Sequence, residues 1–180
     1  MAYIGVRKPF VVPFGSTAGK YGAKVAFGKA TSFEESPNNS NATLYGDDAM
    51  AESDKAVTSA NLTLGTTDIP AAAAAVLFNH TSADGVETAN IDDAQGYCGF
   101  AVIGVKVVNG VKSYEARVYP KTQWSEPGTS LTTRGESTEF QTPSTEGVAM
   151  ANDDGDWRYI KECTTEADAL TFIDSKFPTT

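Results

Sequence analysis

Two segments of the sequence carry residue types that catalytic or phosphate-binding sites use. Residues 15–21 are Gly-Ser-Thr-Ala-Gly-Lys-Tyr, close to the loop that holds phosphate groups with backbone amides and a lysine. The two glycines are one residue too close together, and Tyr21 stands where that loop needs a serine or threonine. A glycine-rich turn accounts for this segment better. His80 is the only histidine, and no nucleophile-elbow sequence accompanies it. We therefore expect no catalytic residue and no enzymatic activity.

The acidic residues and cysteines also lack the spacing of a metal or acid–base site. Asn152–Asp156 concentrates oxygen-bearing side chains but lacks the spacing and closing glutamate of an EF-hand loop, and its Asp-Gly pair is typical of a hairpin turn. The adjacent acids Glu34 and Glu35 should point in different directions in an extended segment, as solvated charges. Cys98 and Cys163 match no metal motif and are expected to be small buried hydrophobes. We expect neither a metal nor a cofactor.

Length, composition and charge indicate one domain over residues 1–180. Hydrophobic residues make up 41% of the 180 residues, enough for a core. No apolar run approaches the ~20 residues of a membrane-spanning helix, and the absence of secretory features predicts assembly in a cytoplasm. The net charge of −9, from 23 acidic and 14 basic residues, disfavours nucleic-acid binding through basic patches. The same charge would suit a conduit whose wall does not hold DNA.

Short strand-like segments separated by turns predict a mainly β fold, a sandwich or barrel. The clearest hairpin joins the apolar run 97–108 to residues 111–119 through Asn109-Gly110, a type I′ turn signal. Residues 56–65 alternate between apolar and polar side chains, as a half-buried strand does.

Two helices and two polar loops complete the expected elements. Residues 71–78 should form a helix capped by Asp68, and residues 164–180 should form a C-terminal helix and tail. Ser36–Asn41 and Asp47–Asp54 are polar and are expected to be exposed loops.

A strand expected at residues 137–150 has little to bury in its first part. Between Ser137 and Glu146, polar side chains occupy both faces, and Phe140 is the only large apolar residue. Such a strand is explained if it pairs with another chain in a closed oligomeric barrel, or if it is a solvent-exposed edge strand. The turn 152–156 should then lead into a second hairpin strand at 157–160.

An ordered set of short segments resembles one protein family. The segments are Ala42–Asp48, Ala60–Leu64, Asp68–Pro70, Gly99–Phe100, Asn109–Gly110, Tyr119–Lys121 and Glu139–Pro143. In this order they resemble the major tail (tail tube) proteins of long-tailed, non-contractile bacteriophages of Gram-positive bacteria. The resemblance runs from about Lys24 to Trp157, and departs from the family pattern in the alanine-rich segment 71–78.

The resemblance implies a structural virion protein with two packed antiparallel β-sheets and a flanking helix, to which the sequence pattern adds the C-terminal helix. Hexameric rings of the chain would stack into the tail tube, in the virion tail, after assembly in the bacterial host cytoplasm. Its partners would be further copies of itself and the tape measure, distal tail and tail terminator proteins. Genomic DNA would pass through the lumen without specific binding. Residues 1–21 lie outside the resemblance and are expected to be an N-terminal arm that links subunits or rings.

The resemblance also implies an acidic lumen and a loop that reaches the neighbouring ring. The acids proposed for the lumen are Glu34, Glu35, Asp47, Asp48, Glu139 and Glu146. The inter-ring loop is expected within residues 34–54, at Ser36, Pro37, Asn38, Asn39, Ser40 and Asn41.

An alternative is a β-sandwich binding or adhesion module that forms no tube. Modules of that kind usually expose a row of aromatic side chains, whereas Trp124 and Trp157 are isolated in the sequence and lie beside expected turns.

Overall fold

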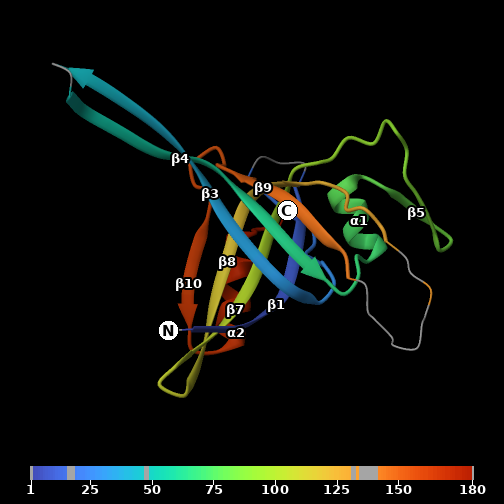
Figure 1. Ribbon diagram of the computed structural model, residues 1–180. Helices are drawn as coiled ribbons and strands as arrows, with labels where there is room; N and C mark the ends of the chain where they lie inside the picture. The colour runs from blue at the N-terminus through green and yellow to red at the C-terminus, as the bar shows by residue number, and fades with distance from the viewer. Residues whose placement is uncertain (1, 16–18, 47–48, 131–132, 134–141, 180) are drawn as a thin grey trace.

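The computed structural model describes residues 2–15, 19–46, 49–130, 133 and 142–179, and only the backbone of residues 42–46 and 49–54. The elements in chain order are β1 (Ala2–Pro13), β2 (Val25–Ala26), β3 (Ala30–Gly46), β4 (Ala49–Thr66), α1 (Ala71–Phe78), β5 (Thr81–Ala83), β6 (Val86–Thr88), β7 (Cys98–Val108), β8 (Val111–Trp124), β9 (Ser144–Met150), β10 (Tyr159–Cys163) and α2 (Glu166–Lys176). The predicted fold class, mainly β with two antiparallel sheets, a flanking helix and a C-terminal helix, is confirmed (Figure 1).

The predicted hairpin of β7 and β8 lies at the centre of the larger sheet. Asn109 and Gly110 have φ values of 51° and 79°, the two positive φ angles that a type I′ turn requires. β7 is buried on both faces from Cys98 to Lys106, because α2 covers one face and α1 with the outer strands covers the other. Burial on both faces explains why this run is apolar without alternation.

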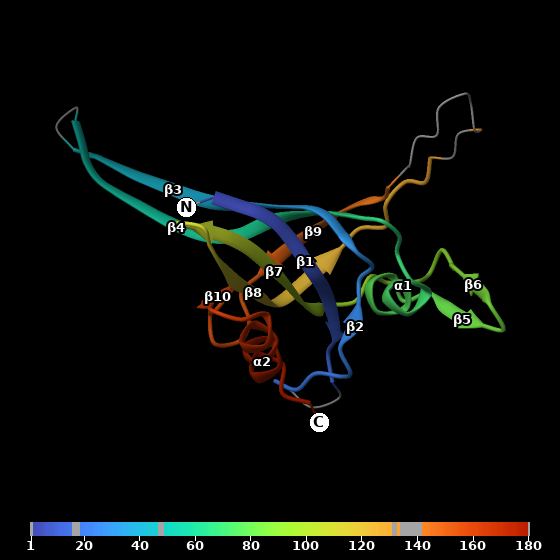
Figure 2. The same cartoon turned by 90° about the horizontal axis from the view of Figure 1, so that it is seen from below.

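The larger sheet has the strand order β2-β1-β7-β8-β9-β4-β3, with β10 paired beside β8, while β5 and β6 form a separate hairpin. The sheet bends until its ends meet, so that β1 and β3 are in contact without pairing. Phe33 of β3 lies over the rings of Phe100 and Tyr119, with centroids 5.8 and 6.0 Å away. β3 and β4 thus form a second layer over the central strands (Figure 2).

The first strand lies in the sheet. β1 pairs with β7 from Ala2↔Val107 to Pro13↔Cys98, and Val11 and Val12 are buried on opposite faces. The expectation of an arm over residues 1–21 is therefore wrong for residues 2–13, because their apolar side chains complete the core of the subunit itself.

α1 has the predicted bounds, and α2 lies within the segment 164–180 that was expected to form the C-terminal helix and tail. The Thr165 side chain accepts a hydrogen bond from the Asp168 amide at the start of α2, and Ile173 and Phe177 pack against the sheet. α1 begins after Pro70 without a side-chain cap, so the expectation of an Asp68 cap is wrong.

The largest difference from the sequence-based expectations is the β3–β4 hairpin. Ser36–Asn41, expected to be a loop, lies inside β3 and pairs with residues 55–61 of β4. Residues 49–54, also expected in a loop, pair with residues 42–46. Backbone pairing with the second strand holds these polar residues in extended form, and Pro37 is tolerated because β3 is the last strand of the sheet.

Residues 137–141 of the expected strand 137–150 lie outside the described residues; the rest of that strand and the hairpin after it are corrected. The described strand, β9, covers Ser144–Met150 and lies between β8 and β4, so it is not an edge. Its side chains alternate, with Thr145 buried and Glu146 exposed. The turn at 152–156 joins β9 to β10, but these strands do not pair with each other; both pair with β8.

Candidate functional site

The exposed face of the outer layer brings together two of the predicted acids. Thr63 of β4 lies opposite Glu34 of β3 on one side and opposite Glu146 of β9 on the other. The three residues therefore form one row across three strands. Glu34 and Glu146 are both exposed, and two strand spacings of about 4.8 Å separate their backbones by roughly 10 Å.

The rows beside these acids are mostly polar. Ser36, Asn61 and Val148 form the next row, and Gln123 of β8 follows beside Val148. Further along the hairpin, the Asn38 side-chain amide donates to Asn61 Oδ1 at 3.1 Å and to Ser59 Oγ at 3.2 Å. We call this surface the polar face. It is defined by Ser32, Glu34, Ser36, Asn38, Ser59, Asn61, Thr63, Ser144, Glu146, Val148 and Gln123.

The polar face exists because the opposite face of the same strands supplies the core. Leu62 and Leu64 of β4 and Ala149 of β9 have no exposed surface and pack with Trp124. Alternation along each strand then turns the neighbouring polar residues away from the core.

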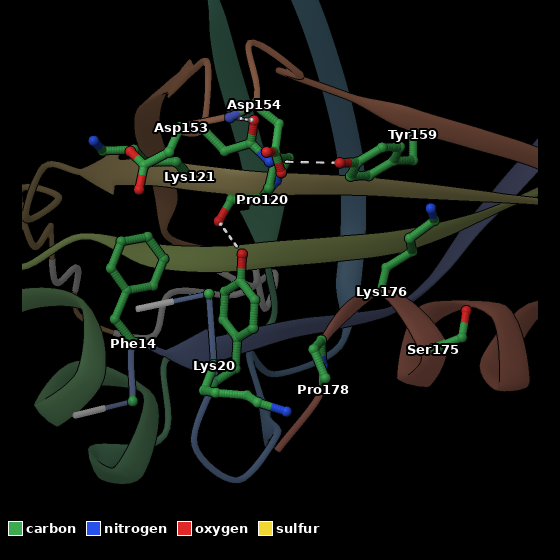
Figure 3. Close-up of a pocket in the computed structure, with 14 residues that line it drawn as sticks. Phe14, Lys20, Pro120, Lys121, Asp153, Asp154, Tyr159, Ser175, Lys176 and Pro178 are labelled. Carbon is green, nitrogen blue, oxygen red and sulfur yellow. Dashed lines mark hydrogen bonds between the residues drawn. The ribbon is translucent and has the colours of Figure 1, made fainter. Parts of the chain in front are cut away.

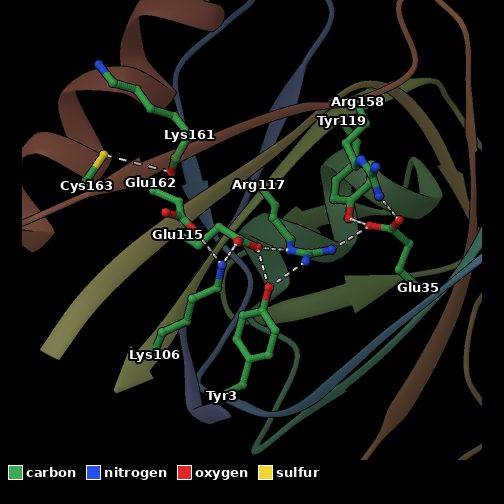
Figure 4. A network of polar contacts seen from close by, with 10 residues as sticks. All are labelled: Tyr3, Glu35, Lys106, Glu115, Arg117, Tyr119, Arg158, Lys161, Glu162 and Cys163. Carbon is green, nitrogen blue, oxygen red and sulfur yellow. Dashed lines mark hydrogen bonds and ion pairs between the residues drawn. The ribbon is translucent and has the colours of Figure 1, made fainter. Parts of the chain in front are cut away.

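Glu35 follows Glu34 in the chain but faces the opposite way. Its carboxylate accepts hydrogen bonds from the Tyr119 hydroxyl, from Arg158, and from Arg117 Nη1 at 3.0 Å (Figure 4). Only 7% of the Glu35 side chain is exposed. Burial and the nearby Glu35 carboxylate raise the pKa of Tyr119, which keeps its hydroxyl protonated as a donor. The prediction that Glu35 is a lumen acid is therefore wrong, because two arginines neutralise it inside the subunit.

A second carboxylate, Glu115, extends this cluster. It pairs with Lys106, and it accepts hydrogen bonds from Arg117 Nε at 2.6 Å and from the Tyr3 hydroxyl at 2.7 Å. Lys106 also donates to Glu162 at 2.7 Å. Burial alone would raise the pKa of Glu115, but the bonds from Lys106 and Tyr3 and the charge of Arg117 hold that pKa below its ordinary value. The bond to Glu115, followed by that to Glu162, raises the pKa of Lys106.

We call this set the ion cluster. Its members are Tyr3, Glu35, Lys106, Glu115, Arg117, Tyr119, Arg158 and Glu162. Three carboxylates face three cations, so the cluster carries no net charge. Sequence reasoning missed it, although the position of Glu35 two residues after the inward-facing Phe33 was an available signal.

The remaining predicted positions have other outcomes. Asp47, Asp48 and Glu139 lie outside the described residues. The candidate loop Ser36–Asn41 belongs to β3, and its members Ser36, which is exposed, and Asn38, which is half-buried, contribute to the polar face.

A cavity of about 380 Å³ lies beside the glycine-rich turn after β1 (Figure 3). Its walls carry Lys20, Lys121 and Lys176 together with Asp153 and Asp154. The Tyr21 hydroxyl, which could otherwise meet a ligand, donates to the Pro120 carbonyl at 3.0 Å. The segment after Lys20 continues to a bridge between Tyr21 and Thr179, whereas a phosphate-binding loop would enter a helix there.

The contacts of His80 link separate segments of the chain. The ring is nearly buried, with Nδ1 2.7 Å from Glu87 and Nε2 3.7 Å from Glu126. It thereby connects β6 and the segment after β8 to the end of α1.

The described part of the chain contains no group of three or more His, Cys, Asp or Glu side chains suited to a metal ion. Among the helices in these ranges, none is long and apolar enough to cross a bilayer. Neither a scan of protein-family models nor a search of curated proteins finds a match for the sequence.

Proposed function

We propose that this chain is a structural subunit of a bacteriophage tail tube, in which hexameric rings stack around a channel for genomic DNA. The tube would belong to the virion tail, and the chain would act through assembly and not through catalysis. The family resemblance of the sequence supplies the identity of the assembly. The β3–β4 hairpin supplies the physical argument.

The observation that carries the proposal is the length of this hairpin beyond the rest of the sheet. Only Ala60–Gly65 of β4 pair with β9; in the described part of the chain, residues 49–59 pair with β3 alone. At ~3.3 Å per residue, this portion extends roughly 35 Å. Figures 1 and 2 show it projecting well past the central strands.

A projection of this kind has a cost for an isolated subunit. A two-stranded ribbon is marginally stable in water, and a long edge strand offers its backbone to other chains. Contact with neighbouring copies would stabilise the ribbon and cover its edge. This argument supports self-assembly over a solitary binding or adhesion module.

The polar face supports a channel lining. It presents hydroxyls, amides and the acids Glu34 and Glu146 without a basic side chain in the row between them. Such a surface repels phosphate groups, so DNA could move along it without being retained.

Electron microscopy of the purified chain tests the proposal. The wild-type protein should form rings or tubes at high concentration. A variant in which Asn38 is joined to Ser59 by an Asn-Gly turn lacks the projection but keeps a register pair at the new hairpin end. We expect this variant to melt cooperatively yet to form no tubes.

A control variant shortens the separate β5–β6 hairpin by joining Thr81 to Thr88 with the same Asn-Gly turn. It should still assemble. Normal tubes from the β3–β4 truncation, or a wild-type chain that stays monomeric under all conditions, would contradict the proposal.

A further inference from the structure

The inner part of β3 is held to the central layer by few side chains. Among the described residues, β3 pairs through its backbone with β4 alone. Across the layers, Phe33 contacts Phe100 and Tyr119, and Glu35 contacts Arg117, Tyr119 and Arg158. These contacts lie just before Pro37, where β3 begins to leave the body of the subunit.

Glu35 is the ionic part of this attachment. Its partners come from two places: Arg117 and Tyr119 lie in β8, and Arg158 precedes β10. Both carboxylate oxygens are used, Oε2 by Arg117 and Tyr119 and Oε1 by Arg158. Bonds from different directions restrict the rotation as well as the position of the carboxylate.

The burial of Glu35 limits how far dissolved salt can weaken its ion pairs. The Glu35 side chain is 7% exposed, compared with 20% for Arg117 and 29% for Arg158. Bulk salt weakens buried pairs much less than exposed ones. A largely buried carboxylate that loses a cation is left with an uncompensated charge, so intermediate positions of β3 are unfavourable.

We infer that Glu35 is a positioning residue, the joint that sets the direction in which the β3–β4 hairpin leaves the body. The importance of that direction for assembly rests on the proposed tube function. The joint itself does not depend on that function. Phe33 provides apolar contact at this point, and Glu35 selects one orientation from those that the contact allows.

Pulsed electron paramagnetic resonance can measure the hairpin direction in the full chain. Spin labels would be attached to Val57→Cys on the hairpin and Thr171→Cys on α2, both exposed, with Cys98 and Cys163 replaced by alanine. Glu35→Gln should broaden the distance distribution about twofold, because a neutral amide cannot hold both arginines.

The preceding residue is a matched control. Glu34→Gln makes the same chemical change on the polar face and should leave the distribution unchanged. Tyr119→Phe and Arg158→Gln each remove one partner of Glu35 and should give intermediate widths. Because Arg158 is partly exposed, its variant keeps the test informative if Glu35→Gln folds poorly. An unchanged distance distribution in both Glu35→Gln and Arg158→Gln would overturn the inference that Glu35 sets the hairpin direction.

Microscopy of the unlabelled variants tests the consequence for assembly separately. Glu35→Gln should give fewer and less regular tubes than Glu34→Gln. If Glu35→Gln broadened the distance distribution but formed normal tubes, Glu35 would still set the hairpin direction, but that direction would not matter for assembly. A wild-type chain that forms no tubes would refute the proposed function. The distance measurement would still show whether Glu35 sets the hairpin direction.

Discussion

Two neighbouring glutamates face opposite environments in β3. Glu34 is exposed in a row with Thr63 and Glu146, whereas Glu35 is enclosed by Arg117 and Arg158. Alternation along the strand predicts that they diverge. It does not predict the cations that meet Glu35, since these come from residues distant in the sequence.

At the same scale, Glu115 should make a measurable contribution to stability. Glu115→Gln leaves Lys106, itself 8% exposed, without its closest carboxylate, so the free energy of unfolding should fall by about 3 kcal/mol at neutral pH. Because the folded-state pKa of Glu115 is lowered, its stabilising effect is full above the ordinary value of 4.5 and is lost as pH falls below it. The difference from wild type should therefore shrink in acid.

Urea unfolding curves at several pH values measure both effects. Glu146→Gln, an exposed carboxylate on the polar face, is the control and should change stability by less than about 0.5 kcal/mol. Equal losses in the two variants, or a difference that grows in acid, would contradict this account of Glu115.

At the scale of elements, α2 depends on a glycine in β7. A Cβ at Gly99 would lie 2.4 Å from Cε1 of Phe177, whose ring also packs edge-on against Tyr21 at 4.8 Å. Gly99→Ala should displace Phe177 and lower the free energy of unfolding by about 1–3 kcal/mol. Hydrogen exchange should accelerate in α2 before it does so in β7 and β8.

Gly5→Ala in β1 provides the comparison. A Cβ at Gly5 meets no atom within 4 Å, so this variant should keep the stability and exchange pattern of the wild type. If Gly99→Ala matched it, close packing of Phe177 on the backbone of Gly99 would not be what holds α2.

At the scale of the whole molecule, the −9 net charge is consistent with a surface over which DNA slides. The proposed tube makes this testable. Tubes of Glu34→Lys/Glu146→Lys should retain double-stranded DNA at ~50 mM salt and release it by ~200 mM, whereas wild-type tubes should retain none. Co-sedimentation of labelled DNA with the tubes measures this.

A second variant with the same net charge tests whether the position of the added lysines matters. Asp92→Lys/Asp153→Lys reverses two exposed acids that are not members of the polar face. It should retain much less DNA than the polar-face variant. Similar retention by the two variants would show that net charge matters and that the polar face has no special place.

The sequence alone determined the features that depend on residues close together in the chain. Asn109-Gly110 specified a turn because both residues adopt positive φ readily. Apolar periodicity likewise predicted a mainly β chain with two helices.

Only the tertiary structure decided which strand each polar segment meets. Ser36–Asn41 had the composition of a loop, yet its backbone hydrogen bonds are satisfied by β4, so it forms part of a long hairpin. Glu35 resembled a solvated acid until β8 and the segment before β10 placed Arg117 and Arg158 beside it. Backbone pairing and charge neutralisation depend on partners far along the chain. The local sequence pattern cannot predict those partners.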